Sequence, residues 1–223
     1  MRFYKSAILA FLALPASAVM AAPPTGAVTG TIPLPARPQG RIAVEKYTGT
    51  ISGKVANPPP PRAGVWIEGL GVTAGNSPAR VVLSQEGYQF AQSLLVLSRG
   101  TTVEFPNKDS DYHNIGSLSR TKRFDIGRYK KDETPVPTVT FDKPGLVKLK
   151  CEIHEHMNAV ILVVDSPWHG VTDAAGKFTL KGIPQGSYTL RAQLDEKTQW
   201  SVPITITAGK TTSVDFTQPA ALP

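Results

Sequence analysis

The chain alternates apolar and polar residues over many short stretches, and none of these stretches keeps the 3.6-residue period of an amphipathic helix. In residues 101–105 (TTVEF), Val103 and Phe105 share one face of an extended segment. Residues 145–152 (GLVKLKCE) alternate in the same way, so Cys151 ends a strand with its sulfur on the apolar side. Glycines and prolines separate these stretches, and the pattern therefore predicts an all-β protein with many turns.

The pattern also divides the chain into segments. Residues 22–46 are rich in proline, glycine and small side chains, and we expect them to form a mobile leader outside any core. Residues 47–78 contain two strand signals, around Ile51–Val55 and Gly64–Glu68, separated by a run of four prolines that is typical of a stiff turn. The remaining segments are a strand-rich module at 79–165, four further strand signals within 166–217, and a tail at 218–223.

The first 21 residues have the features of a secretory signal peptide. Arg2 and Lys5 precede an apolar stretch, Ala7–Leu14, and small residues follow it. The apolar stretch is too short to span a bilayer, and we find no other that is long enough. We therefore expect an exported protein, located in the periplasm after cleavage of residues 1–21, with no transmembrane segment.

Charge restricts the function only slightly. The formal net charge is +7 and falls to +5 when Arg2 and Lys5 leave with the signal peptide. This moderate excess favours acidic partners, and no combination of basic and aromatic residues indicates nucleic-acid binding.

The only cysteine of the chain belongs to a group of potential metal ligands. Cys151, His154 and Met157 follow the predicted strand closely, and His113 lies 38 residues before Cys151, after another strand and turn. By itself, a lone cysteine in an exported protein is a buried apolar residue, a reactive thiol, half of an intermolecular disulfide or a metal ligand. Thiolate, imidazole and a weak thioether together suit copper, which alternates between Cu(I) and Cu(II).

Other chemistries fit these residues less well. Zinc is the alternative metal, but thioether is a poor zinc ligand. A catalytic pair of Cys151 and His154 would need a cleft and an orienting group, for which Glu155 is the nearby candidate. A copper enzyme with a second, catalytic copper would need about three further histidines beyond the two of an electron-transfer site, whereas the chain has four in all. We therefore expect no enzymatic activity.

At this point the sequence resembles the cupredoxins. His113-Asn114, the Cys-x-x-His-x-x-Met spacing of residues 151–157, and the flanking stretches GTTVEFPNKD and FDKPG are similar to those of cupredoxins with the amicyanin type of loop. The closest resemblance is to cupredoxin-like methylamine utilization proteins. It implies a Greek-key β-sandwich over 79–165 with one mononuclear type 1 copper site. By this resemblance His113, Cys151 and His154 are equatorial ligands, Met157 is the axial ligand, and Asn114 forms a hydrogen bond to the cysteine loop.

The loop departs from that family pattern in two ways. Ile153 and Glu155 flank His154 where amicyanin-type loops carry prolines. His156 is an alternative ligand beside Met157, although we expect it to be an exposed loop residue. His169, which follows the last strand of the module, is expected to lie in a linker.

The C-terminal part resembles a second kind of domain. Residues 172–192 (TDAAGKFTLKGIPQGSYTLRA) are similar to the carboxypeptidase-regulatory-like or prealbumin-like sandwich. That fold usually opens with two strands that residues 166–217 lack, and residues 47–78 resemble them. We therefore expect a small β-sandwich made from 47–78 and 166–217, with the cupredoxin module inserted into it.

The expected function is that of a periplasmic type 1 copper protein carrying single electrons between redox partners. Copper delivery and a non-redox structural metal site are the alternatives. A basic stretch at 120–131 is a solvated loop, a surface for an acidic redox protein such as a cytochrome or a dehydrogenase, or a patch for an anionic membrane surface. Its basic residues are Arg120, Lys122, Arg123, Arg128, Lys130 and Lys131.

Overall fold

The computed structural model describes residues 23–36, 59–70 and 80–217, and within these ranges all regular structure is β-strand. The prediction of an all-β protein is therefore confirmed. The strands are β1 (Thr25–Thr31), β2 (Gly64–Glu68), β3 (Arg80–Val82), β4 (Leu94–Ser98), β5 (Thr101–Glu104), β6 (His113–Leu118), β7 (Arg123–Tyr129), β8 (Thr138–Phe141), β9 (Gly145–Lys150), β10 (Asn158–Val164), β11 (His169–Val171), β12 (Lys177–Pro184), β13 (Gly186–Gln193), β14 (Gln199–Ile206) and β15 (Thr211–Asp215).

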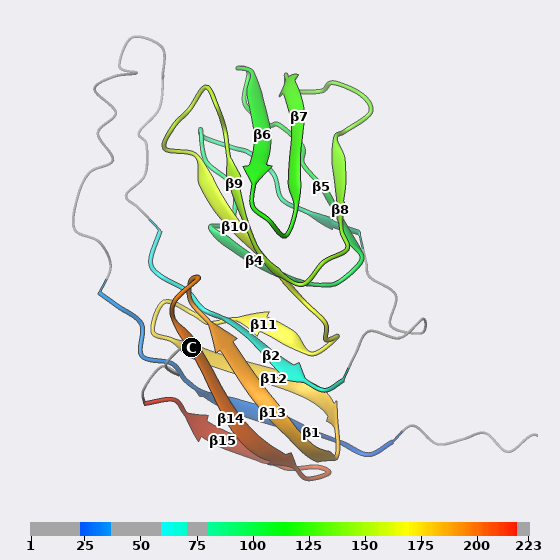
Figure 1. The fold of residues 1–223 in the computed structure, drawn as a ribbon, viewed down its shortest axis with the longest axis vertical. Coiled ribbons are helices and arrows are strands. Elements are labelled where there is room, and N and C mark those ends of the chain that lie inside the picture. The colour runs from blue at the N-terminus through cyan, green and yellow to red at the C-terminus, as the bar shows by residue number, and fades with distance from the viewer. Residues whose placement is uncertain (1–22, 37–58, 71–79, 218–223) are drawn as a thin grey trace, which may run out of the picture.

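The strands from β3 to β10 form one sandwich, drawn in green to yellow in Figure 1. One of its sheets has the order β4-β10-β9-β6-β7, and the other has the order β3-β5-β8. Their inner faces enclose a core that includes Phe105, Phe141 and Ile161, all fully buried. The alternation expected in β9 is present, since Val147 and Leu149 are fully buried while Lys148 and Lys150 are exposed.

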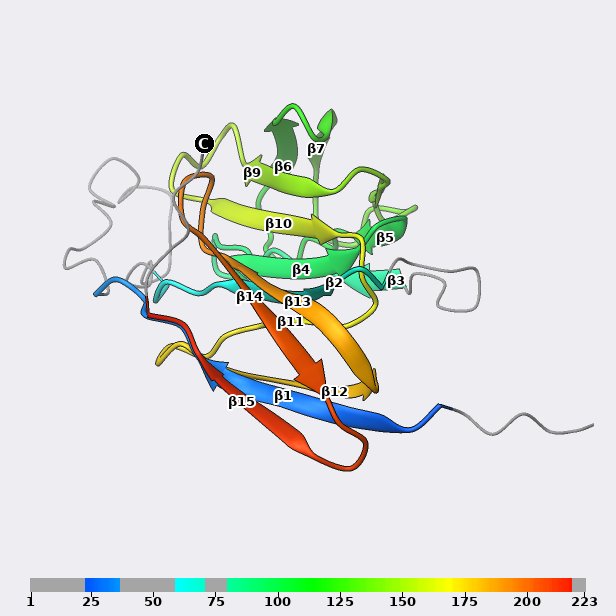
Figure 2. The same ribbon diagram turned by 60° about the horizontal axis from the view of Figure 1, so that its bottom comes forward.

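The remaining strands form a smaller sandwich below the first in Figure 1. Its sheets have the orders β12-β1-β15 and β11-β2-β13-β14. Trp200, Ile67 and Leu190 are among the side chains buried between them. In both sheets a strand from the N-terminal side of the first sandwich, β1 or β2, lies between strands from its C-terminal side (Figure 2).

The expectation that residues 22–46 form a leader outside any core is wrong for Thr25–Thr31. These residues form β1, antiparallel to β12 and parallel to β15, and Val28 is fully buried. The pairing requires small residues, because a Cβ at Gly30 would lie 1.7 Å from the carbonyl oxygen of Val214. Composition suggested a leader because the segment is rich in proline, glycine and small residues. The local sequence does not indicate the pairing, because both partner strands of β1 lie about 150 or more residues away along the chain.

Some expectations concern residues outside the described ranges. The signal peptide at 1–21, the strand around Ile51–Val55 and the tail at 218–223 fall there. The other strand expected before the insertion, Gly64–Glu68, has those bounds as β2. Within the described residues there is no helix long and apolar enough to cross a membrane.

The two sandwiches contact each other through a third apolar cluster. Val96 of β4 and Leu162 of β10, on the outer face of the larger sheet, pack with Trp66 of β2 and Val171 of β11. His169, expected in a linker, instead begins β11 and faces Ser98 of β4, with 3.2 Å between Nε2 and Oγ. The chain thus leaves the small sandwich after β2, forms the large one, and returns at β11.

Candidate metal centre

Three strand ends of the large sandwich bring the predicted ligands together. His113 begins β6, Cys151 follows β9 directly, and Met157 immediately precedes β10. The loop between Cys151 and Met157 is closed by two backbone hydrogen bonds, from Cys151 N to Met157 O (3.2 Å) and from Met157 N to His154 O (2.8 Å). Because β9 lies between β6 and β10, the loop is held beside His113.

Three donor atoms face one another at this point. The Nδ1 atoms of His113 and His154 are 3.1 Å apart, and Cys151 Sγ lies 4.0 Å from the first and 3.6 Å from the second. A point equidistant from the three atoms lies about 2.1 Å from each, close to metal–nitrogen and metal–sulfur bond lengths. The residues therefore fit a single metal ion in a trigonal arrangement of two imidazoles and one thiolate.

The protonation of Cys151 and His154 favours metal binding. At His113, in contrast, burial lowers the pKa but the contacts with Cys151 and Asp109 outweigh it and raise this pKa, so a metal ion would have to displace a proton there. Burial raises the pKa of the Cys151 thiol, but hydrogen bonds from His113 and from backbone N–H groups outweigh it, so this pKa lies below its usual value. Burial lowers the pKa of His154, and the nearby charge of His113 lowers it further, so this imidazole stays neutral. Metals bind thiolate and neutral imidazole, the forms that this environment favours at Cys151 and His154.

Asn114 makes the contact that the resemblance implies. Its Oδ1 accepts a hydrogen bond from Glu152 N at 2.6 Å, and its Nδ2 donates to Asp125 Oδ1 at 3.2 Å. Since Glu152 follows Cys151, this side chain ties the cysteine end of β9 to β6.

Met157 lies in the core of the large sandwich, whereas His156 lies outside the group of facing donor atoms. Met157 is 1% exposed and belongs to the core of the large sandwich. His156 is outside the group formed by His113, Cys151 and His154, and its Nε2 lies 3.0 Å from the backbone oxygen of Tyr88.

Sequence patterns did not indicate the residues that surround the two histidines. Asp109 Oδ2 lies 2.8 Å from His113 Nε2, on the side of the ring opposite the facing donor atoms. The ring of Tyr88 stands edge-on to both imidazoles, at centroid distances of 5.7 Å to His113 and 5.1 Å to His154. Asp109 is close to His113 in the sequence, but a spacing of four residues outside a helix does not predict a contact. Tyr88, in contrast, lies in a segment farther away along the chain, and no motif in the sequence links that segment to the site.

The basic residues of 120–131 form two groups instead of one patch. Strand β7 separates Arg123 from Arg128 by five positions, or about 16 Å along an extended strand. Lys122 pairs with Asp142 at the end remote from His113. At the other end, β7 pairs with His113 through Tyr129, and Lys130 Nζ lies 4.6 Å from the ring centre of Tyr112.

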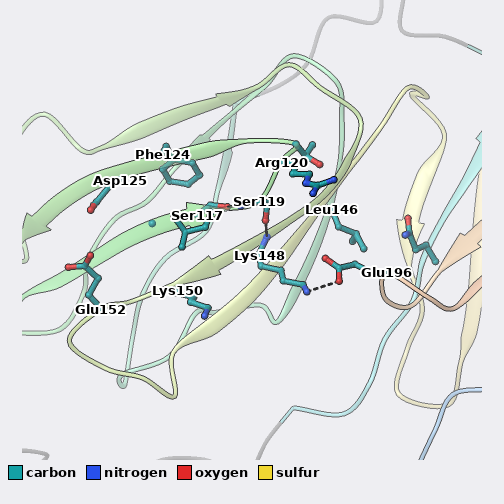
Figure 3. Close-up of a pocket in the computed structure, with 14 residues that line it drawn as sticks. Ser117, Ser119, Arg120, Phe124, Asp125, Leu146, Lys148, Lys150, Glu152 and Glu196 are labelled. Atoms are coloured by element: carbon teal, nitrogen blue, oxygen red, sulfur yellow. Dashed lines mark hydrogen bonds and ion pairs between the residues drawn. The ribbon is translucent and has the colours of Figure 1, made fainter.

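A cavity of about 670 Å³ lies on the outer face of the larger sheet, next to the small sandwich (Figure 3). Lys148, Lys150 and Glu152 of the cysteine-bearing segment point into it, and Glu196 of the small sandwich pairs with Lys148 at 2.9 Å. Its charged side chains are of both signs, and the metal-ligand group lies on the opposite face of β9.

The fold and the facing donor atoms together define an all-β protein whose larger sandwich carries a candidate mononuclear metal site. Comparison with known proteins gives partial matches to each sandwich. The family model of the carboxypeptidase regulatory-like domain matches residues 157–218. No curated protein matches the chain.

Similar solved structures are copper proteins that match less than half of the chain. A Cu-containing nitrite reductase (NirK) from Thermus scotoductus SA-01 is 27% identical over 42% of this chain, with a TM-score of 0.36, and the match spans a quarter (25%) of that enzyme. Amicyanin from Paracoccus versutus is 22% identical over 45% of this chain and 97% of its own, with a TM-score of 0.35. An amicyanin variant in the reduced Cu(I) form at pH 4 is 18% identical over 45% of this chain and 98% of its own, with a TM-score of 0.36.

Proposed function

We propose that the protein is a type 1 copper protein that carries single electrons between redox partners in the periplasm. The observation that carries this proposal is the group of two imidazole nitrogens and one thiol sulfur, 3.1 to 4.0 Å apart and shielded from solvent. Copper, when bound, supplies a couple between Cu(I) and Cu(II). The chain supplies a soft thiolate that favours Cu(I) and imidazoles that suit both oxidation states.

The surroundings of the donor atoms support electron transfer more than substrate chemistry. His113 is fully buried, Cys151 is 3% exposed and His154 is 9% exposed, which leaves little room for a substrate beside them. Of the other two histidines in the chain, His156 contacts Tyr88 and His169 lies at the junction between the sandwiches. This distribution supports a protein without enzymatic activity of its own.

The proposed partner is an acidic redox protein that docks at the metal end of the large sandwich. Arg128, Lys130 and Lys131 are exposed there, at the end of β7 that pairs with His113. Arg120, Lys122 and Arg123 lie at the other end of the hairpin and would steer approach instead of contacting the partner near the site. Export to the periplasm rests on the signal-peptide features of residues 1–21.

The direct test is the visible spectrum of the purified protein loaded with Cu(II). We expect an intense thiolate-to-copper charge-transfer band, lost in Cys151→Ser and retained in His169→Asn, which removes a histidine outside the site. Circular dichroism of both variants would verify that the β-structure is intact. A colourless Cu(II) complex with Cys151 still reactive toward a thiol reagent would contradict the proposal, and tight binding of zinc with no coloured copper form would indicate a structural metal site.

A further inference from the structure

Residues 86–89 form a tight turn directly over the two histidines. Glu86 N donates to Gln89 O at 2.9 Å, and both central residues have left-handed backbone, with φ of 63° at Gly87 and 59° at Tyr88. Glycine adopts this conformation readily, but tyrosine seldom does, so the surroundings must hold Tyr88 in place.

Two aspartates hold this turn on the site. Asp109 Oδ1 accepts from Gly87 N at 2.7 Å, and Asp109 Oδ2 accepts from Tyr88 N at 2.9 Å. The same Oδ2 faces His113 Nε2 at 2.8 Å. Asp109 therefore connects the turn and the imidazole through one carboxylate. Asp111 accepts a hydrogen bond from the Tyr88 hydroxyl.

Tyr88 in turn contacts both imidazoles. Its ring is nearly perpendicular to those of His113 (83°) and His154 (80°), and its backbone oxygen faces His156 Nε2 at 3.0 Å. The hydrogen bond to Asp111, together with burial and the nearby negative charges, raises the pKa of Tyr88 to about 12, so the phenol remains a proton donor.

We propose that the turn of residues 86–89, fixed by Asp109 and Asp111, retains the metal by holding both imidazoles in their binding orientation whether or not metal is present. Asp109 and Tyr88 are positioning residues, since neither belongs to the group of facing donor atoms. Asp109 fixes the ring of His113 through Nε2 and leaves Nδ1 directed at Cys151. Tyr88 covers the side from which a competing acceptor would approach His154.

This inference rests on the proposed function for the identity of the metal, and it decides between two alternatives. A delivery protein must release its copper quickly to an acceptor, whereas an electron carrier must keep copper in both oxidation states. A restrained pair of histidines under a fixed turn favours the carrier. Loss of a carboxylate that orients a ligating histidine typically weakens metal binding about 10- to 100-fold.

The first experiment measures how fast Cu(I) passes from the protein to bathocuproine disulfonate, a coloured Cu(I) chelator. We expect transfer to be about 10- to 100-fold faster in Asp109→Ala than in the parent protein. Tyr88→Ala should also be faster, while Tyr88→Phe, which loses only the hydrogen bond to Asp111, should be closer to the parent. Asp142→Ala is the matched control, because Asp142 is an exposed carboxylate paired with Lys122.

The second experiment uses the metal-free protein and does not depend on copper. The Nε2 proton of His113 should give a slowly exchanging signal by nitrogen-resolved NMR in the parent and in Asp142→Ala, and should exchange rapidly in Asp109→Ala. If Asp109→Ala does not fold, Asp109→Ser replaces it. The serine hydroxyl ends one bond short of the carboxylate oxygens, so it lies too far from His113 Nε2 to accept its proton, and the contact with His113 should still be lost.

The outcomes separate the two proposals. Absence of a charge-transfer band in the parent protein would contradict the type 1 copper function, while the NMR experiment would still test the restraint on His113. A coloured parent protein whose Asp109→Ala variant transfers Cu(I) at the parental rate, or keeps a protected His113 proton, would overturn the inference about the turn.

Discussion

At the scale of single residues, the choice between Met157 and His156 determines the chemistry of the site. Met157 is buried beside the loop that carries His154, whereas His156 turns toward the backbone of Tyr88. A thioether in the axial position binds weakly and leaves the thiolate and two imidazoles dominant. An imidazole there would bind more strongly, favour Cu(II) and lower the reduction potential.

We therefore predict that Met157→Leu keeps the visible band but raises the reduction potential, because the variant loses an electron donor to Cu(II). His156→Ala should leave both the band and the potential nearly unchanged. Visible spectroscopy and protein-film voltammetry of the copper-loaded variants would measure the two effects. The opposite result, with His156→Ala shifting the potential and Met157→Leu silent, would assign the axial position to His156.

The sequence was sufficient to predict the residues that carry the facing donor atoms, but not the residues that orient the two imidazoles. Three of the donors, His113, Cys151 and His154, could be predicted from the sequence. The chain has one cysteine and four histidines, and the spacing of these three residues suits a single metal ion. Asp109 and Tyr88 could not be predicted, because aspartate and tyrosine are common surface residues. Their role depends on a contact between separate loops that has no periodic signal.

At the scale of elements, the alternation of apolar and polar residues predicted most strands correctly. The turns between the strands depend instead on single side chains. The turn between β13 and β14 is an example, since Asp195 Oδ1 accepts from both Lys197 N and Thr198 N at 2.8 Å. Burial raises the pKa of Asp195, but the hydrogen bonds together outweigh it and lower the pKa below its usual value of 3.8. The ionised carboxylate thus stabilises the turn.

We predict that Asp195→Ala destabilises the small sandwich by about 1 kcal/mol at pH 7, the typical contribution of such side-chain hydrogen bonds. Asp195→Asn should cost less, since its Oδ1 still accepts. Because the folded-state pKa is lowered, the advantage of the parent over Asp195→Ala is complete above the unfolded pKa, near 3.8, and disappears as the pH falls through the folded pKa. Urea denaturation at several pH values would measure it, and a difference that persists unchanged to pH 2 would contradict this explanation.

Element-level patterns failed where a strand had distant partners or where a strand separated residues that are close in sequence. Strand β1 resembled a leader because its glycines and short side chains fit a crowded position between β12 and β15. The basic stretch at 120–131 resembled a patch, but β7 extends through it and places its charges at opposite ends.

At the scale of the whole molecule, the small sandwich depends on strands from both sides of the large one. Both β1 and β2 are inner strands of their sheets, and Val28, Val65 and Ile67 are fully buried. Residues 166–223 alone would lose these side chains and expose the edges of four strands. A fragment of this size buries too little apolar area to offset its chain entropy.

We therefore predict that a fragment of residues 166–223 does not fold, while a fragment of 79–165 keeps the metal site and binds Cu(II) with the visible band. The larger fragment should be less soluble than the full chain, because Val96 and Leu162 lose the cover of the small sandwich. Circular dichroism and thermal denaturation of the two fragments would test this, with the full chain as reference. Cooperative unfolding of 166–223 alone would show that the small sandwich does not need β1 and β2.

The order in which these strands are synthesised has a consequence for the nascent chain. Thr31 of β1 binds Asp215 of β15, 184 residues later, so β1 and β2 leave the ribosome long before their partners exist. An exposed strand in that interval could pair with another chain. Prolines at 23, 24, 33 and 35 flank β1, and glycines interrupt it, features that discourage such pairing. The composition that makes β1 resemble a leader thus also discourages it from pairing with another chain until β12 and β15 have been synthesised.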